Sequence, residues 1–152
     1  MDTSSCGYDI EPVLRKLVKV SPNQSHDKTV DEIERIFRDF GFFTTREYKI
    51  FSMKDGSGRT GRIDLVARKG KFRVAVEYDH KYSVKFKSFQ KIVQIKPEVA
   101  IAITGFGFLT ESEKRAERYK TMLSLYVISL KEGRYRLVND ALPHKETTSE
   151  SY

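Results

Sequence analysis

Several kinds of residue that support common functional sites are scarce in this sequence. The single cysteine, Cys6, excludes a disulfide framework, a cysteine-rich zinc site and a cysteine-ligated iron–sulfur centre. No run of about 18 apolar residues occurs, which argues against a transmembrane helix. The N-terminal segment lacks a basic stretch followed by an apolar one, so we expect no secretory signal and a cytoplasmic protein. A bound metal ion would therefore depend mainly on oxygen ligands.

The net charge of +7 is concentrated in one segment, residues 62–96. This segment holds ten lysines and arginines against three acids, while the remainder of the chain holds 18 residues of each sign. A local excess of this kind indicates a polyanionic partner such as nucleic acid. The ordinary alternative is a solvated basic surface without a ligand. The three acids inside the segment favour the functional interpretation.

The length of 152 residues is enough for one domain but not comfortably for two. Residues 1–8 and 142–152 are polar and weakly patterned, so we expect flexible ends around a single domain at 9–141. Hydrophobic periodicity predicts helices over residues 10–18, 30–40, 84–95 and 110–122, and strands over residues 42–51, 62–68, 72–78, 99–104, 123–130 and 135–138. This order predicts a mixed α/β domain.

Two of these elements have clear end signals. Thr29 and Glu32 form a capping-box pattern before the helix at 30–40, and Gly41 follows it. The run at 99–104, VAIAIT, is apolar throughout, which is typical of a strand covered on both faces. We therefore expect a sheet with helices on both sides.

Three acids on neighbouring strands are the candidate chemical groups. Side chains alternate along a strand, so Glu77 and Asp79 share one face of the strand at 72–78, and Asp64 lies on the preceding strand. Acids on apolar strands are costly to bury without compensation, which suggests a shared cation. Mg²⁺ is the natural choice, because it prefers hard oxygen ligands completed by water and phosphate oxygens.

Asp64, followed thirteen residues later by Glu77-x-Asp79 with Lys81 close by, resembles the motif of the PD-(D/E)XK nuclease superfamily. The resemblance covers roughly residues 29–104 and implies the restriction endonuclease-like αβββαβ core, with a mixed central sheet flanked by helices. It also implies a metal-dependent DNA endonuclease that hydrolyses phosphodiester bonds with Mg²⁺ or Mn²⁺. Asp64 and Glu77 would then be the metal ligands.

One position departs from the family pattern. The lysine that usually stands two residues after the glutamate is replaced by Asp79, which we expect to assist as a third metal ligand. Lys81 is the favoured substitute, because it continues the same strand face. Alternatively, a lysine of the following helix supplies the ammonium group: Lys85, Lys87 or Lys91. The remaining alternative is a catalytically inactive protein of this fold that binds nucleic acid.

Other residues are assigned supporting roles. Glu32, Glu34 and Gln90 are candidates to lie at or behind the metal. We expect the phosphate backbone to contact a basic set: Lys54, Arg59, Arg62, Lys85, Lys87 and Lys91. His26 carries no signal, whereas Tyr78, Tyr82 and Phe106 are the aromatic residues that fit core stripes least well.

The expected partner is DNA, with RNA as an alternative substrate, and no membrane is involved. Double-strand cutters with one site per subunit often pair, so we also expect a homodimer, with the apolar segment 123–130 as one contact surface.

Overall fold

The computed structural model describes residues 9–54, 60–119 and 123–140 of the chain. Its elements are, in chain order, α1 (Glu11–Leu17), α2 (His26–Asp39), β1 (Phe43–Lys54), β2 (Thr60–Lys69), β3 (Phe72–Asp79), α3 (Phe86–Gln94), β4 (Val99–Thr104), α4 (Leu109–Ala116), the 3₁₀ turn η1 (Glu117–Tyr119), β5 (Ser124–Ser129) and β6 (Arg134–Asn139). The ends that the sequence predicts to be flexible, 1–8 and 142–152, lie outside the described ranges, as do residues 120–122 of the last predicted helix.

Within these ranges, the six strands form one mixed sheet in the order β1-β2-β3-β4-β5-β6. β1, β2 and β3 form an antiparallel meander, β3, β4 and β5 run parallel, and β6 returns antiparallel to β5. Helices α3 and α4 make the crossovers between the parallel strands, as parallel pairing requires. The sheet flanked by helices confirms the predicted α/β class and is compatible with a restriction endonuclease-like fold.

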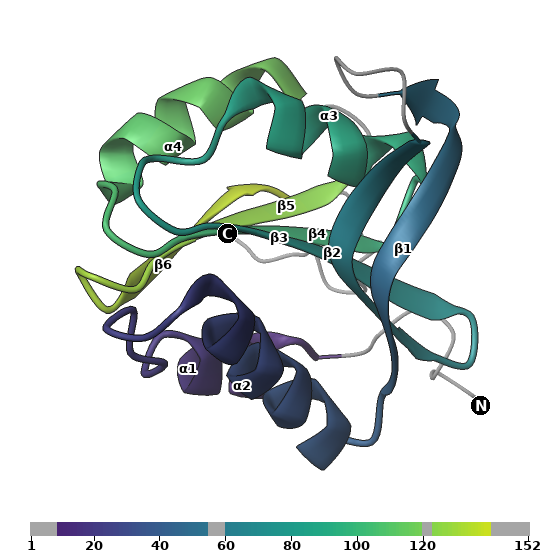
Figure 1. The fold of residues 1–152 in the computed structure, drawn as a ribbon, viewed down its shortest axis with the longest axis horizontal. Coiled ribbons are helices and arrows are strands. Elements are labelled where there is room, and N and C mark those ends of the chain that lie inside the picture. Colours follow the sequence, from purple (N-terminus) through teal and green to yellow (C-terminus); the bar gives the residue numbers. More distant parts are fainter. Residues whose placement is uncertain (1–8, 55–59, 120–122, 141–152) are drawn as a thin grey trace, which may run out of the picture.

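Helices cover both faces of this sheet, as Figure 1 shows. Helices α1 and α2 bury Leu14, Ile33 and Phe37 against one face, and α3 and α4 bury Phe89 and Leu109 against the other. Because β4 and β5 lie inside the sheet, every residue of both strands is buried. No helix in the described ranges is long and apolar enough to cross a lipid bilayer.

The side chains of β3 alternate between the two faces, as the sequence predicts. Val74, Val76 and Tyr78 belong to the core under α1 and α2, whereas Ala75 belongs to the core under α3 and α4. Glu77 shares the face of Ala75, and it therefore points toward α3. This alternation places a carboxylate inside the layer between the sheet and α3.

Two predictions about individual elements are wrong. Helix α2 begins at His26, because Ser25 is its N-cap and accepts a hydrogen bond from the Lys28 N–H, while Thr29 is buried within the first turn. The segment 123–130 is not an exposed contact surface, because all of its residues are buried within one chain. By contrast, Gly41 follows the end of α2 with φ 89°, as its position predicts.

Candidate functional site

Asp64 and Glu77 meet where β2 separates from β3. The paired register of the two strands ends at Leu65 and Val76. Just beyond, the Asp64 N–H donates to Oε2 of Glu77 at 2.8 Å, and the Tyr78 N–H donates to Oδ2 of Asp64 at 2.8 Å. Each carboxylate therefore takes the place of a backbone acceptor in the ladder. Asp64 and Glu77, the acid pair, are held side by side at this fork.

The acid pair is poorly compensated electrostatically. The Glu77 side chain is 3% exposed, and burial together with the neighbouring Asp64 charge raises the pKa of Glu77 to about 8. Burial also raises the pKa of Asp64. Among the described lysines and arginines, Lys91 contacts the pair, with its Nζ 3.0 Å from Oε1 of Glu77. When both carboxylates are ionised, one ammonium group does not balance them, so the ionised pair favours additional positive charge.

Lys91 reaches the acid pair from α3. The helix buries Ser88, Phe89 and Ile92, which fixes its orientation on the sheet and turns Lys91 toward β3. Among the lysines considered in the sequence, Lys91 is therefore the one beside Glu77. Lys85 and Lys87 are exposed at the start of the helix.

Lys81 lies beyond the end of β3 and is exposed. The alternation that would keep it on the Glu77 face ends with the strand at Asp79, after which the chain bends through residues 80–83. The structure therefore does not bring Lys81 into contact with the acid pair.

The carboxylate of Asp79 forms hydrogen bonds with the start of α3. Its Oδ2 accepts hydrogen bonds from the Lys85 N–H at 2.9 Å and from the Ser88 hydroxyl at 2.8 Å. The N-cap residue, Lys85, provides no side-chain cap of its own. Asp79 therefore caps the helix from the end of β3, at the position where the family motif has its lysine, and it holds the helix that carries Lys91.

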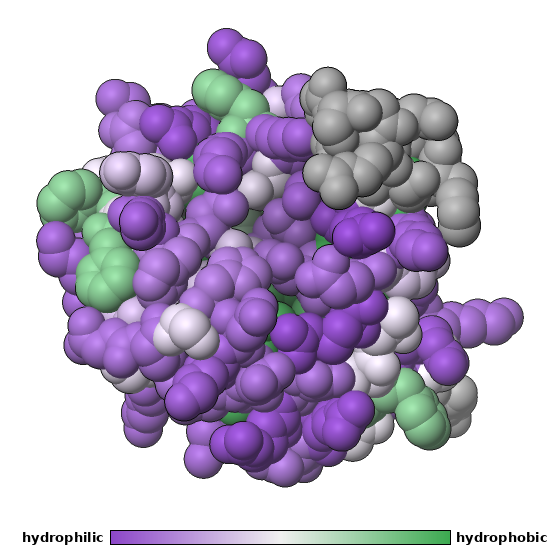
Figure 2. Space-filling model, viewed as in Figure 1, coloured by the Kyte–Doolittle hydropathy of each residue, from purple (hydrophilic) through white to green (hydrophobic). Residues whose placement is uncertain are grey.

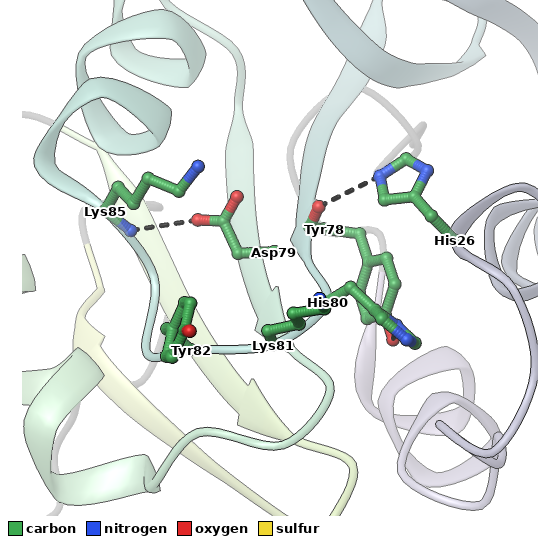
Figure 3. A pocket seen from close by; sticks show the side chains of 7 residues that line it. All are labelled: His26, Tyr78, Asp79, His80, Lys81, Tyr82 and Lys85. Atoms are coloured by element: carbon green, nitrogen blue, oxygen red, sulfur yellow. Dashed lines mark hydrogen bonds between the residues drawn. The ribbon is translucent and has the colours of Figure 1, made fainter.

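His26 is a site residue that the sequence analysis missed. Its Nε2 lies 3.2 Å from the Tyr78 carbonyl oxygen and 3.9 Å from Oδ2 of Asp64 (Figure 3). The imidazole stands at the first position of α2, after the Ser25 cap. Recognising Ser25 as the N-cap would have placed His26 at the helix start, but only the fold brings that start to β3.

A cavity of about 440 Å³ opens at the carboxyl end of β3. Its lining contains neither acid of the pair, but it includes Tyr78 and His26, which both lie next to Asp64. Figure 3 shows His26 and Asp79 on opposite sides of the strand, with the 80–82 loop between them. The cavity is lined by His26, Tyr78, Asp79, His80, Lys81, Tyr82 and Lys85. Within the described residues, no carboxylate pairs with the ammonium groups of Lys81 and Lys85. The opening is therefore suited to an anionic ligand.

Several candidates named from the sequence lie elsewhere. Glu34 accepts from the Thr44 hydroxyl at 2.6 Å and pairs with Arg38 and Arg46, and Glu32 accepts from Gln24. Gln90 is exposed, and Arg62 lies 3.9 Å from Glu47. Arg59 and the Lys54 side chain fall outside what the structure describes. None of the described candidates in this group contacts the acid pair.

The described residues contain no cluster of three or more histidine, cysteine, aspartate or glutamate side chains arranged to hold a metal ion. A metal at this site would therefore depend on the two carboxylates of the acid pair, with the remaining positions taken by main-chain oxygen, water or substrate.

No protein-family model matches the chain, and no curated protein matches it. Among solved structures, a protein of unknown function, AF1548, is similar with a TM-score of 0.42 and 14% identity over 77% of this chain and 56% of its own. The MspJI restriction endonuclease in complex with a 27-mer oligonucleotide is similar with a TM-score of 0.39 and 16% identity over 80% of this chain and 29% of its own. The chain thus spans less than two thirds of either protein.

Proposed function

We propose that this chain is a Mg²⁺- or Mn²⁺-dependent nuclease that hydrolyses phosphodiester bonds in DNA. The observation that supports the proposal is the meeting of Asp64 and Glu77 at the fork between β2 and β3, with Lys91 at 3.0 Å from Glu77. The adjoining cavity carries lysines without carboxylate partners among the described residues. Two acids that can hold a metal ion, an ammonium group and a basic opening are groups that metal-assisted phosphodiester hydrolysis can use.

The donor chemistry of the acid pair fits a divalent cation. Burial raises the pKa of both carboxylates, and the charge of Asp64 raises the pKa of Glu77 further, so a cation between them would relieve both burial and repulsion. Asp64 and Glu77 would hold the ion, with water and phosphate oxygens as its other ligands. When bound, it would polarise the scissile phosphate and lower the pKa of an attacking water.

The protein's own residues then have separable tasks. Lys91 favours the ionised form of Glu77 and is placed to stabilise negative charge that develops on the phosphate. Lys81 and Lys85 hold neighbouring phosphates at the cavity. Asp79 acts as a positioning residue, because its hydrogen bonds to the start of α3 fix the helix that presents Lys91. His26 fixes the Tyr78 carbonyl beside Asp64.

A nucleic-acid-binding protein of this fold without cleavage activity is the second candidate. The observation that favours it is the engagement of Asp79 with α3, since the residue in the family's lysine position serves the helix instead of the acids. This candidate keeps the basic cavity and dispenses with the metal.

Incubation of the purified chain with plasmid and branched DNA tests the proposal. We expect cleavage in Mg²⁺ or Mn²⁺ that EDTA stops and that Asp64→Asn and Glu77→Gln each abolish. Asp39→Asn is the matched control, because Asp39 is exposed and lies at the last position of α2, at the opposite end of the helix from His26. Salt-sensitive binding with no cleavage in either metal would overturn the nuclease and support the binding protein.

A further inference from the structure

Exposed aromatic side chains gather at the carboxyl edge of the parallel strands. The face shown in Figure 2 is mostly hydrophilic and carries a few small apolar areas. In the described residues, six large apolar side chains are exposed, and three of them belong to loops at this edge: Tyr82 at 71%, Phe106 at 37% and Phe108 at 56%. Exposed aromatic residues concentrated on one edge indicate a binding surface more than scattered ones do.

Main-chain hydrogen bonds join the loops that carry these aromatic residues. The loop after β4 donates from Phe106 N–H to the His80 carbonyl at 3.0 Å, and the loop after β5 donates from Lys131 N–H to the Gly105 carbonyl at 2.9 Å. The Thr104 hydroxyl donates to the Tyr82 carbonyl. We call residues 80–85, 105–108 and 130–131 the aromatic edge. These bonds hold its three segments together, and the first segment lines the cavity.

Two glycines allow this close packing. A Cβ atom at Gly105 would overlap the Tyr78 hydroxyl and the His80 carbonyl, and one at Gly107 would overlap the backbone of Ser83. The sequence GFGF therefore alternates residues that must be small with phenylalanines that stand outward. The His80 and Phe106 rings meet edge to face at 5.4 Å. The aromatic side chains are thus presented on a tightly packed base.

The charge of the aromatic edge selects an anionic ligand. Its three segments contain three lysines and no acid. Nζ of Lys131 lies 4.8 Å from the centre of the Phe108 ring, and Lys81 and Lys85 line the adjoining cavity. Glu132, the acid that follows Lys131, accepts the Leu109 N–H and lies 3.8 Å from Arg134. Aromatic faces interspersed with cations are the surface that unpaired nucleotides bind, through stacked bases and neutralised phosphates.

We propose that the aromatic edge binds a single-stranded segment of DNA and leads it to the acid pair. The inference rests on the proposed function, and it narrows the substrate class to DNA with unpaired nucleotides, such as a flap, a fork or a single strand. A continuous duplex keeps its bases stacked inside and would leave Tyr82 and Phe108 in water, whereas unpaired bases can stack on them.

Binding without metal separates this inference from catalysis. Fluorescence anisotropy in EDTA would compare labelled oligothymidine with its duplex at one ionic strength, using the whole chain. We expect the single strand to bind more tightly, and Tyr82→Ala or Phe108→Ala to weaken its binding by roughly 10-fold, the ordinary effect of one stacked base. Both side chains are mostly exposed, so the variants should fold.

Two matched variants test the role of the aromatic ring. Tyr82→Phe keeps the stacking face and should bind like the wild type. Phe43→Ala removes a phenylalanine that is equally exposed, at 71%, but lies on β1 at the far side of the sheet, and it should have no effect. Polyglutamate should compete poorly, because it supplies negative charge without bases.

The possible outcomes distinguish failure of the single-strand site from failure of the proposed nuclease. Equal or tighter binding of the duplex, an unchanged affinity in Tyr82→Ala, or full competition by polyglutamate would overturn the aromatic edge as a single-strand site. Metal-dependent cleavage without a preference for unpaired DNA would overturn the inference and leave the nuclease standing. Tight single-strand binding with no cleavage would support the aromatic edge and overturn the nuclease.

Discussion

Glu77 combines near-complete burial with a neighbouring acid and a single cation. Its pKa of about 8 lies above the ordinary value of 4.5, so between these values the folded protein keeps a proton that the unfolded chain releases. The stabilising effect of this proton is present at low pH and is lost as the pH rises through that window. The loss is limited to about 1.4 kcal/mol for each pH unit.

We therefore expect the metal-free protein to lose thermal stability as the pH rises from 4.5 toward 8. Glu77→Gln, which carries no titrating proton, should show a flatter dependence and should be more stable than the wild type at the alkaline end. Thermal unfolding in EDTA across this range measures the effect. Parallel curves for the wild type and the variant would contradict the assignment, and Asp39→Asn, an exposed change at the far end of α2, should follow the wild type.

We expect Lys91, and not Lys81, to take part in the chemical step. Lys91→Met keeps the apolar stem and removes the ammonium group next to Glu77, so we expect cleavage to fall by about 100-fold or more. Lys81→Met removes an exposed phosphate contact, so we expect a loss below about 10-fold that appears as weaker substrate binding. Single-turnover cleavage over a range of DNA concentrations measures both, because the rate at saturation reports the chemical step and the half-saturating concentration reports binding. A larger loss in Lys81→Met would return the role to the lysine nearer in sequence.

The sequence singles out the two acids that the structure brings together, but not their surroundings. Asp64 and Glu77 stand out because acids interrupt apolar strands, and alternation correctly turns Glu77 away from Val76 and Tyr78. Alternation fails for Lys81, because it holds only while the strand continues. Contacts between distant elements, such as that of His26 with the end of β3, follow from packing that no local pattern records.

The N-terminus of helix α3 is capped by a residue that lies outside the helix. Lys85 offers no cap, and Asp79 accepts from the Lys85 N–H and the Ser88 hydroxyl. Because a lost cap costs about 0.5–2 kcal/mol, Asp79→Ala should lower the free energy of unfolding by that amount. Asp79→Asn should restore part of it, since the amide oxygen still accepts. Urea unfolding measures the difference.

If Asp79 holds α3 in place, its loss should also reduce cleavage through the displacement of Lys91. The expected sign is a lower catalytic rate at saturating DNA in Asp79→Ala, with partial recovery in Asp79→Asn. A direct metal ligand would behave differently, because the amide would restore stability without restoring cleavage or metal affinity. Titration of both variants with Mn²⁺ distinguishes the two roles.

The elements with strong periodicity could be predicted well, and their ends less so. The strand at 99–104 coincides with β4, since a continuous apolar run leaves little choice of boundary. The start of α2 was misplaced because Thr29 and Glu32 imitate a capping box. In the structure the Thr29 hydroxyl donates to the Ser25 carbonyl at 2.9 Å, and Glu32 accepts from Gln24. Two nearby capping patterns compete, and tertiary packing decides between them.

Across the whole molecule, exposed lysines of the basic segment lie at both ends of the parallel strands. Lys85 and Lys87 lie at the start of α3, by the carboxyl end of β3, whereas Lys71 precedes β3 and Lys96 precedes β4. The sequence predicts the basic segment but not this arrangement, which follows from the crossover that carries α3 over the sheet (Figure 1). Mutation of lysines at each end can therefore distinguish attraction of DNA by the net charge of the protein from binding at one local surface.

Two double variants with the same change in net charge test which description holds. If the start of α3 binds phosphates, the double variant Lys85→Gln and Lys87→Gln should weaken DNA binding. It should also reduce the slope of log affinity against log salt concentration by about 0.9 for each lost contact. Lys71→Gln with Lys96→Gln should leave both quantities close to the wild type, because these exposed residues precede β3 and β4, at the end of the strands opposite the cavity. Anisotropy titrations over a range of salt concentrations in EDTA measure the slopes. Equal losses of affinity in the two variants would show that net charge alone attracts DNA, and would contradict phosphate binding at the start of α3.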